Sequence, residues 1–169
     1  MYVLPPTTKL LNVQKRVYNS KKLTLFLRIV NSFVSCATAA VFFTLFFEFL
    51  CESPIKLLKF LVVVGAPFVA VTVARRLINA KRPYEIYDFY EIPPRKKKGL
   101  SFPSRHAVSV LAVATVALFF RWYLGVPLIL LGALMCAARV LLGIHFIKDV
   151  VAGALSGIVC AVIGTLLLL

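Results

Sequence analysis

Five long apolar runs dominate this chain and leave little room for any architecture other than a membrane bundle. They cover residues 29–50, 57–74, 107–120, 125–142 and 150–169. A helix needs about 20 predominantly apolar residues to cross a bilayer. The hydrophobic content of 61% and the mean hydropathy of +0.93 lie far outside the range of soluble globular domains. We therefore predict an all-α integral membrane protein, with about five transmembrane helices in a single domain over residues 1–169.

Two polar stretches interrupt this pattern. The N-terminal segment 1–23 is basic and polar. Within it, residues 9–22 mix leucines and valines with lysines and arginines, which fits either an amphipathic helix on the membrane surface or a solvated basic tail. Residues 75–104 contain four prolines and the basic run 95–98, so they read as a loop or surface segment and not as a span. Both stretches are expected at the ends of the bundle.

The net charge of +14 indicates which partners the chain has. Its basic residues flank apolar spans and do not line a soluble face with interleaved aromatic residues. Anionic membrane lipids are therefore the expected partners, and nucleic acid is not. The sequence gives no indication of the oligomeric state.

The lysines and arginines also predict an orientation. With five spans, 17 of the 20 fall on the side that holds residues 1–28, 75–105 and 139–149, against Lys56, Lys59 and Arg121 on the other. The positive-inside rule places the richer side in the cytoplasm. We expect a multi-pass protein of the cell membrane.

Polar residues gather in three short clusters next to the apolar runs. Arg75 and Arg82 follow the second run, where they also fit a basic stop at the membrane edge. Ser104, Arg105 and His106 directly precede the third run, where Ser104 also fits a helix cap. A helix N-terminus is at the same time a site for an anion, because its free N–H groups and dipole favour negative charge.

The third cluster contains Arg139, His145 and Asp149. His145 and Asp149 are four residues apart and share a face if the stretch is helical, so the carboxylate can accept the imidazole N–H and raise its nucleophilicity. Gly153 and Gly157 continue this face into the last run and predict close helix packing there. A chain break near Gly143 would let Arg139 converge on the pair. A satisfied polar pair at a helix end is the alternative for His145 and Asp149 alone.

In order and spacing, these clusters resemble the three signature motifs of the type 2 phosphatidic acid phosphatase family, the membrane lipid-phosphate phosphatases. The family pattern is Lys-x6-Arg-Pro, then Pro-Ser-Gly-His, then Ser-Arg-x5-His-x3-Asp. The residues that match it are Arg82, Pro83, Pro103, Ser104, His106, Arg139, His145 and Asp149. This chain has Arg75 in place of the lysine, Arg105 in place of the glycine and Ala138 in place of the serine that begins the third motif.

The resemblance implies a phosphatase that forms a phosphohistidine without a metal or other cofactor. His145 would be the nucleophile, Asp149 its orienting base and His106 the acid for the leaving group. Phosphate would be bound by the remaining cluster residues: Arg75, Arg82, Ser104, Arg105 and Arg139. The sequence agrees with a metal-free site, since it has no carboxylate cluster suited to magnesium or calcium.

The implied substrates are phosphatidic acid, phosphatidylglycerophosphate or a polyprenyl diphosphate. Two other functions stay open at this point: a non-catalytic protein that binds anionic headgroups, and a lipid phosphotransferase. Family members usually have their site on the outer or lumenal face of the membrane, opposite to the face that the positive-inside rule indicates.

Overall fold

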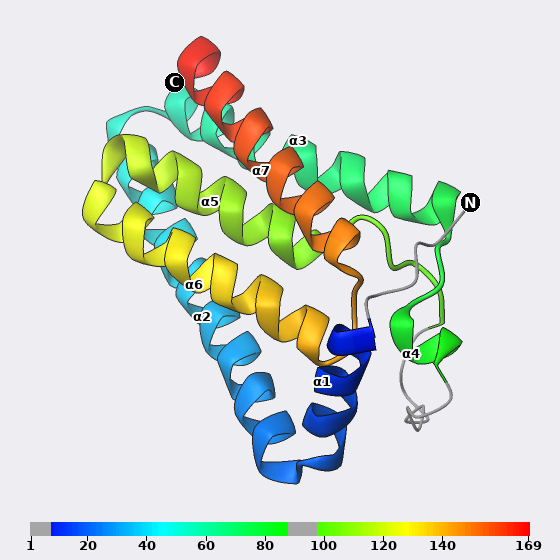
Figure 1. Ribbon diagram of the computed structural model, residues 1–169. Helices are drawn as coiled ribbons and strands as arrows, with labels where there is room; N and C mark the ends of the chain where they lie inside the picture. The colour runs from blue at the N-terminus through cyan, green and yellow to red at the C-terminus, as the bar shows by residue number, and fades with distance from the viewer. Residues whose placement is uncertain (1–7, 88–97) are drawn as a thin grey trace.

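A computed structural model describes residues 8–87 and 98–169, and within these ranges every regular element is an α-helix. Residues 1–7 of the basic N-terminal stretch and residues 88–97 of the predicted 75–104 loop lie outside the described residues. The helices are α1 (Thr8–Asn19), α2 (Lys21–Glu52), α3 (Pro54–Ile78), α4 (Pro83–Ile86), α5 (Arg105–Phe120), α6 (Trp122–Leu141) and α7 (Ile147–Leu168) (Figure 1).

Five of these helices carry the five apolar runs. Four helical stretches are long and apolar enough to cross a membrane: Lys21–Glu52, Pro54–Ile86, Trp122–Leu141 and Ile147–Leu168. The fifth, α5, has 16 residues and a length of about 24 Å, shorter than the roughly 30 Å of a hydrocarbon core. The prediction of a multi-pass helical bundle is confirmed, with α5 as its short member.

The short helix α5 is the centre of the bundle. It packs against α2, α3, α6 and α7, and most of its residues from Ala107 to Ala117 are buried (Figure 1). Gly153 and Gly157 of α7 lie directly on its backbone: a Cβ at either position would stand 2.5–2.6 Å from a carbonyl oxygen of Ser104 or Val108. The prediction that this face of the last span is closely packed is confirmed.

The N-terminal stretch is helical and belongs to the bundle. α1 ends before Ser20, whose hydroxyl caps α2, so the expected segment 9–22 is divided between two helices. Gln14 and Val17 are buried, and Gln14 Nε2 donates a hydrogen bond of 2.8 Å to the carbonyl oxygen of Val140 at the end of α6. The helix alternative is therefore the right one, and α1 rests on the end of α6.

The predicted 75–104 loop begins four residues later than expected. α3 runs on to Ile78, and Asn79 ends it with a left-handed backbone conformation at φ 43°. Arg75 therefore lies in the last helical turn. Its charge does not end the helix because backbone carbonyl groups of the following loop accept its hydrogen bonds.

Candidate active site

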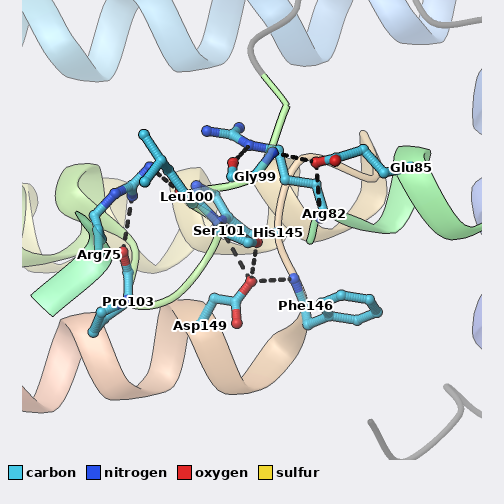
Figure 2. A network of polar contacts seen from close by, with 10 residues as sticks. All are labelled: Arg75, Arg82, Glu85, Gly99, Leu100, Ser101, Pro103, His145, Phe146 and Asp149. Atoms are coloured by element: carbon cyan, nitrogen blue, oxygen red, sulfur yellow. Dashed lines mark hydrogen bonds and ion pairs between the residues drawn. The ribbon is translucent and has the colours of Figure 1, made fainter. Parts of the chain in front are cut away.

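The three polar clusters lie at one end of the bundle. Figure 2 shows Arg75 and Arg82 of the first cluster and His145 and Asp149 of the third, with the segment that leads into the second. The C-terminal turn of α3, the segment 98–104, the first turns of α5 and α7 and the turn 142–146 come together there. Together with Arg82 before α4 and Arg139 in the last turn of α6, these elements carry Arg75, Arg105, both histidines and the buried carboxylate of Asp149. The three clusters, predicted to share one membrane face, thus lie at the same end of the helical bundle.

A buried imidazole–carboxylate pair forms the centre of this site. His145 and Asp149 are 1% and 0% exposed, and His145 Nδ1 lies 3.5 Å from Asp149 Oδ2. Asp149 Oδ2 also accepts a hydrogen bond of 3.0 Å from the backbone N–H of Phe146, which fixes the carboxylate at the start of α7. With Nδ1 turned toward the carboxylate, Nε2 is the nitrogen left for a substrate.

His145 is uncharged at neutral pH. Its pKa is lowered to about 4. Burial is the main cause and the positive charges of Arg139 and Arg82 add to it, whereas the hydrogen bond to Asp149 acts in the opposite direction. The imidazole therefore keeps a free lone pair on Nε2 at pH 7, as a nucleophile requires.

A chain break brings Arg139 to the pair, as the spacing predicts. α6 ends at Leu141, and Gly143 turns the chain with a φ of 64°, a value that glycine adopts without strain. The backbone N–H groups of Ile144 and His145 then both donate to the carbonyl oxygen of Arg139, at 3.0 and 3.3 Å. The same residue thus anchors the turn that carries the nucleophile candidate.

The side chain of Arg139 is only partly satisfied by protein. Its Nη1 donates to Asn31 Oδ1 of α2 at 3.3 Å, whereas its Nε is buried without a hydrogen-bond partner. A guanidinium N–H buried in this way is a donor available to an anion.

Ser104 is the N-cap residue of α5, as the sequence predicts, but its hydroxyl makes no capping hydrogen bond. Its backbone N–H instead donates to the carbonyl oxygen of Asp149 at 2.8 Å, which ties α5 to α7. The Ser104 hydroxyl is fully buried and has no partner among the described residues. Like Arg139 Nε, it is an unused donor at the site.

Arg75 and Arg82 hold the loop that leads into α5. Arg75 donates through Nη1 to the carbonyl oxygen of Pro103 at 2.8 Å and through Nη2 to that of Leu100. Arg82 Nε donates to the carbonyl oxygen of Gly99 at 2.9 Å. Both arginines therefore shape the site, and each keeps further N–H groups, since a guanidinium has five.

Arg105 and His106 occupy the first turn of α5. The Arg105 guanidinium lies over the ring of Phe68 on α3, 5.8 Å from its centroid. His106 has an exposed side chain, in contrast to His145. An exposed imidazole beside a buried one is suited to exchanging protons with a substrate or water.

Three residues of the site escaped the sequence analysis: Ser101, Asn31 and Glu85. Ser101 Oγ donates to Asp149 Oδ2, and Asn31 holds Arg139. Glu85 Oε1 accepts from the backbone N–H groups of Arg82 and Gly99, at 3.1 and 2.7 Å. Asn31 and Glu85 lie outside the motifs, and Ser101 stands two positions before Pro103, the first residue of the second motif; no spacing signal marks any of the three.

The comparisons with known proteins agree with this geometry. Residues 56–168 match the family model of the PAP2 superfamily. The chain belongs to this superfamily. It is therefore a phosphoric ester hydrolase that acts on lipid phosphates, as the motif resemblance implies.

Two solved structures share the fold of this PAP2 protein. The crystal structure of Aquifex aeolicus LpxE has a TM-score of 0.70 and 22% identity, with 97% of this chain and 99% of that chain covered. The first transmembrane PAP2 type phosphatidylglycerolphosphate phosphatase from Bacillus subtilis has a TM-score of 0.61 and 19% identity, with 94% and 86% covered. A search of curated protein sequences found no match.

Proposed function

We propose that this protein hydrolyses a phosphomonoester or diphosphate of a membrane lipid through a phosphohistidine on His145. The observation that carries the proposal is the buried pair of His145 and Asp149, with Nδ1 facing the carboxylate and four arginines around it. An imidazole oriented by a carboxylate is a nucleophile, and the arginines supply the positive charge that a phosphoryl group in transfer requires.

In the first step, His145 Nε2 attacks phosphorus and the bond from phosphorus to the lipid oxygen, or to the bridging oxygen of a diphosphate, breaks. His106 gives a proton to the departing oxygen. In the second step, water attacks phosphorus, the phosphorus–nitrogen bond breaks and inorganic phosphate leaves. His106 takes the proton of that water, which returns both histidines to their starting states.

The transferred phosphoryl group has a set of donors that the protein does not use itself. Ser104 Oγ and Arg139 Nε are buried and unpartnered, and both are suited to its oxygens. Arg75, Arg82 and Arg105 add charge and their remaining N–H groups. Within residues 8–87 and 98–169, no group of three or more His, Cys, Asp or Glu side chains is placed to hold a metal ion.

The candidate substrates are phosphatidic acid, phosphatidylglycerophosphate and a polyprenyl diphosphate. The Bacillus subtilis structure, described as a phosphatidylglycerolphosphate phosphatase, favours the second of these for the first assay. Each of these three lipids has its anionic phosphate at the membrane surface. The arginines of the site, at the ends of the spans, are expected at the same depth.

The test is phosphate release by the purified protein in detergent, with EDTA present, from a panel of these three lipid phosphates. We expect turnover of at least one of them. A non-catalytic headgroup-binding protein would bind the same lipids without releasing phosphate. A phosphotransferase would move the phosphoryl group to an acceptor lipid and release little free phosphate, which thin-layer separation of the products detects.

We propose further that the site faces the cytoplasm, in the cell membrane. Lys56, Lys59 and Arg121 are the Lys and Arg residues at the opposite end, and Arg121 and Lys56 form ion pairs with Glu48 and Glu52. Among residues 8–87 and 98–169, the other lysines and arginines lie on the segments at the site end, and this excess supports a cytoplasmic position.

Labelling of single cysteines with a membrane-impermeant reagent tests this orientation. At the site end, the labelling position is Lys98, which is exposed, whereas Ser101 close by is fully buried and would not react. At the other end, the exposed native Cys51 serves as the labelling position. With the other native cysteines replaced by serine, Lys98→Cys is expected to react only after permeabilisation, and Cys51 in intact cells. Reaction of Lys98→Cys in intact cells would place the site outside.

A further inference from the structure

Ser101 is fixed in the site by its own backbone and by that of its neighbours. It is 0% exposed, and its backbone N–H donates to the carbonyl oxygen of Ala80 at 2.9 Å. Arg75 binds the carbonyl groups of Leu100 on one side and Pro103 on the other. The Ser101 side chain therefore has a defined position relative to α7.

The hydroxyl of Ser101 lies close to both His145 and Asp149 (Figure 2). Ser101 Oγ donates its proton to Asp149 Oδ2 and lies 3.4 Å from His145 Nδ1, while Nδ1 and Oδ2 are 3.5 Å apart. A hydroxyl has one donor and two acceptor positions. With its proton given to the carboxylate, Oγ can only accept from Nδ1–H.

This arrangement bears on which nitrogen of His145 is free to react. Two oxygens, Ser101 Oγ and Asp149 Oδ2, are at similar distances from Nδ1, and both favour the tautomer that carries its proton there. Ser101 and the Phe146 N–H together hold Oδ2, whereas Asp149 Oδ1 is buried without a partner. Without the Ser101 hydroxyl, the Asp149 carboxylate would be held only by the Phe146 N–H and the His145 imidazole.

We propose that Ser101 is a positioning residue of the phosphatase reaction, whose hydroxyl links Asp149 to His145 and holds His145 in the tautomer with Nε2 unprotonated. The proposal rests on the function proposed above. Ser101 does not touch the phosphoryl group. It acts through Asp149 and His145, so its loss affects the chemical step and leaves the phosphate-binding donors in place.

Ser101→Ala is therefore expected to lower kcat about tenfold to a hundredfold, which corresponds to the loss of one hydrogen bond to a charged group. KM is expected to stay within about twofold of the wild-type value. Ser156→Ala is the matched control, because among the described residues the Ser156 hydroxyl donates its hydrogen bond to the carbonyl oxygen of Ala152 in its own helix. The control should leave both constants unchanged.

A double-mutant cycle with Asp149→Asn separates this role from a general effect on folding. If Ser101 acts through Asp149, then adding Ser101→Ala to Asp149→Asn should lower kcat by less than about threefold. If the two substitutions multiply their effects fully, Ser101 acts independently of Asp149 and the proposal is wrong. The melting temperature of each purified variant shows whether a loss of kcat follows a loss of stability.

Ser101→Cys covers the case in which the alanine variant does not fold. A thiol keeps the size of the side chain and is a weaker donor and acceptor than a hydroxyl, so kcat should fall, with KM close to the wild-type value. Wild-type kcat in either folded variant would overturn the proposal. Absence of turnover in the wild-type protein itself would instead refute the proposed function.

Discussion

Replacement of His145 by alanine is expected to lower phosphate release from a lipid phosphate by at least about a thousandfold, because the phosphoryl group loses its acceptor. Asp149→Asn keeps the shape of the side chain but removes the charge that orients and activates the imidazole. For this variant we expect a decrease of roughly a hundredfold to ten-thousandfold. Phosphate release in detergent at saturating substrate measures both.

The controls separate chemistry from folding. Both side chains are fully buried, so the variants must elute from size exclusion like the wild-type protein and must still bind the lipid phosphate. Ser156→Ala serves as the active control. Full activity in a folded His145→Ala variant would refute the phosphohistidine mechanism.

Replacement of Gly157 by valine is expected to have the largest effect on stability. A Cβ at this position would lie 2.6 Å from the carbonyl oxygen of Val108 and 3.2 Å from the backbone N of Ala112, and a helix backbone cannot move aside as a side chain can. We expect α5 and α7 to separate at a cost of about 3 kcal/mol or more. At about 2–4 °C per kcal/mol, the melting temperature should fall by roughly 6–12 °C.

Gly65 of α3 provides the matched control for this prediction. A Cβ at Gly65 meets no atom within 4 Å, so Gly65→Ala should keep or raise the melting temperature, since alanine favours a helix over glycine. Thermal unfolding of the detergent-purified variants measures both changes. Equal melting temperatures for Gly157→Val and Gly65→Ala would show that the contact between α5 and α7 does not limit stability.

The sequence predicted the parts of this protein that depend on composition and local spacing. The apolar runs identified the five helices, and Gly143 identified the break that brings Arg139 to His145. Gly153 and Gly157 identified the packed face of α7. Each of these depends on residues close to one another in the chain, so periodicity and glycine placement carry the information.

The parts that were missed depend on contacts between distant segments. Arg75 remains in a helix because carbonyl groups of the 99–103 segment accept its hydrogen bonds, and Asn31 reaches Arg139 from another span. Ser104 has the position of a cap, but its hydroxyl makes no capping bond. A single sequence contains no signal for such pairings, because they arise only when the bundle assembles.

The most direct test of a phosphohistidine on His145 is the capture of the phosphorylated enzyme. The protein is mixed with a lipid phosphate labelled in its phosphoryl group and quenched within one turnover under alkaline conditions, which preserve phosphohistidine. The labelled peptide is then identified by mass spectrometry. We expect the label on His145 of the wild-type protein and no label in the His145→Ala variant. Label on another residue, or phosphate release by the wild-type protein without any labelled intermediate, would contradict this expectation.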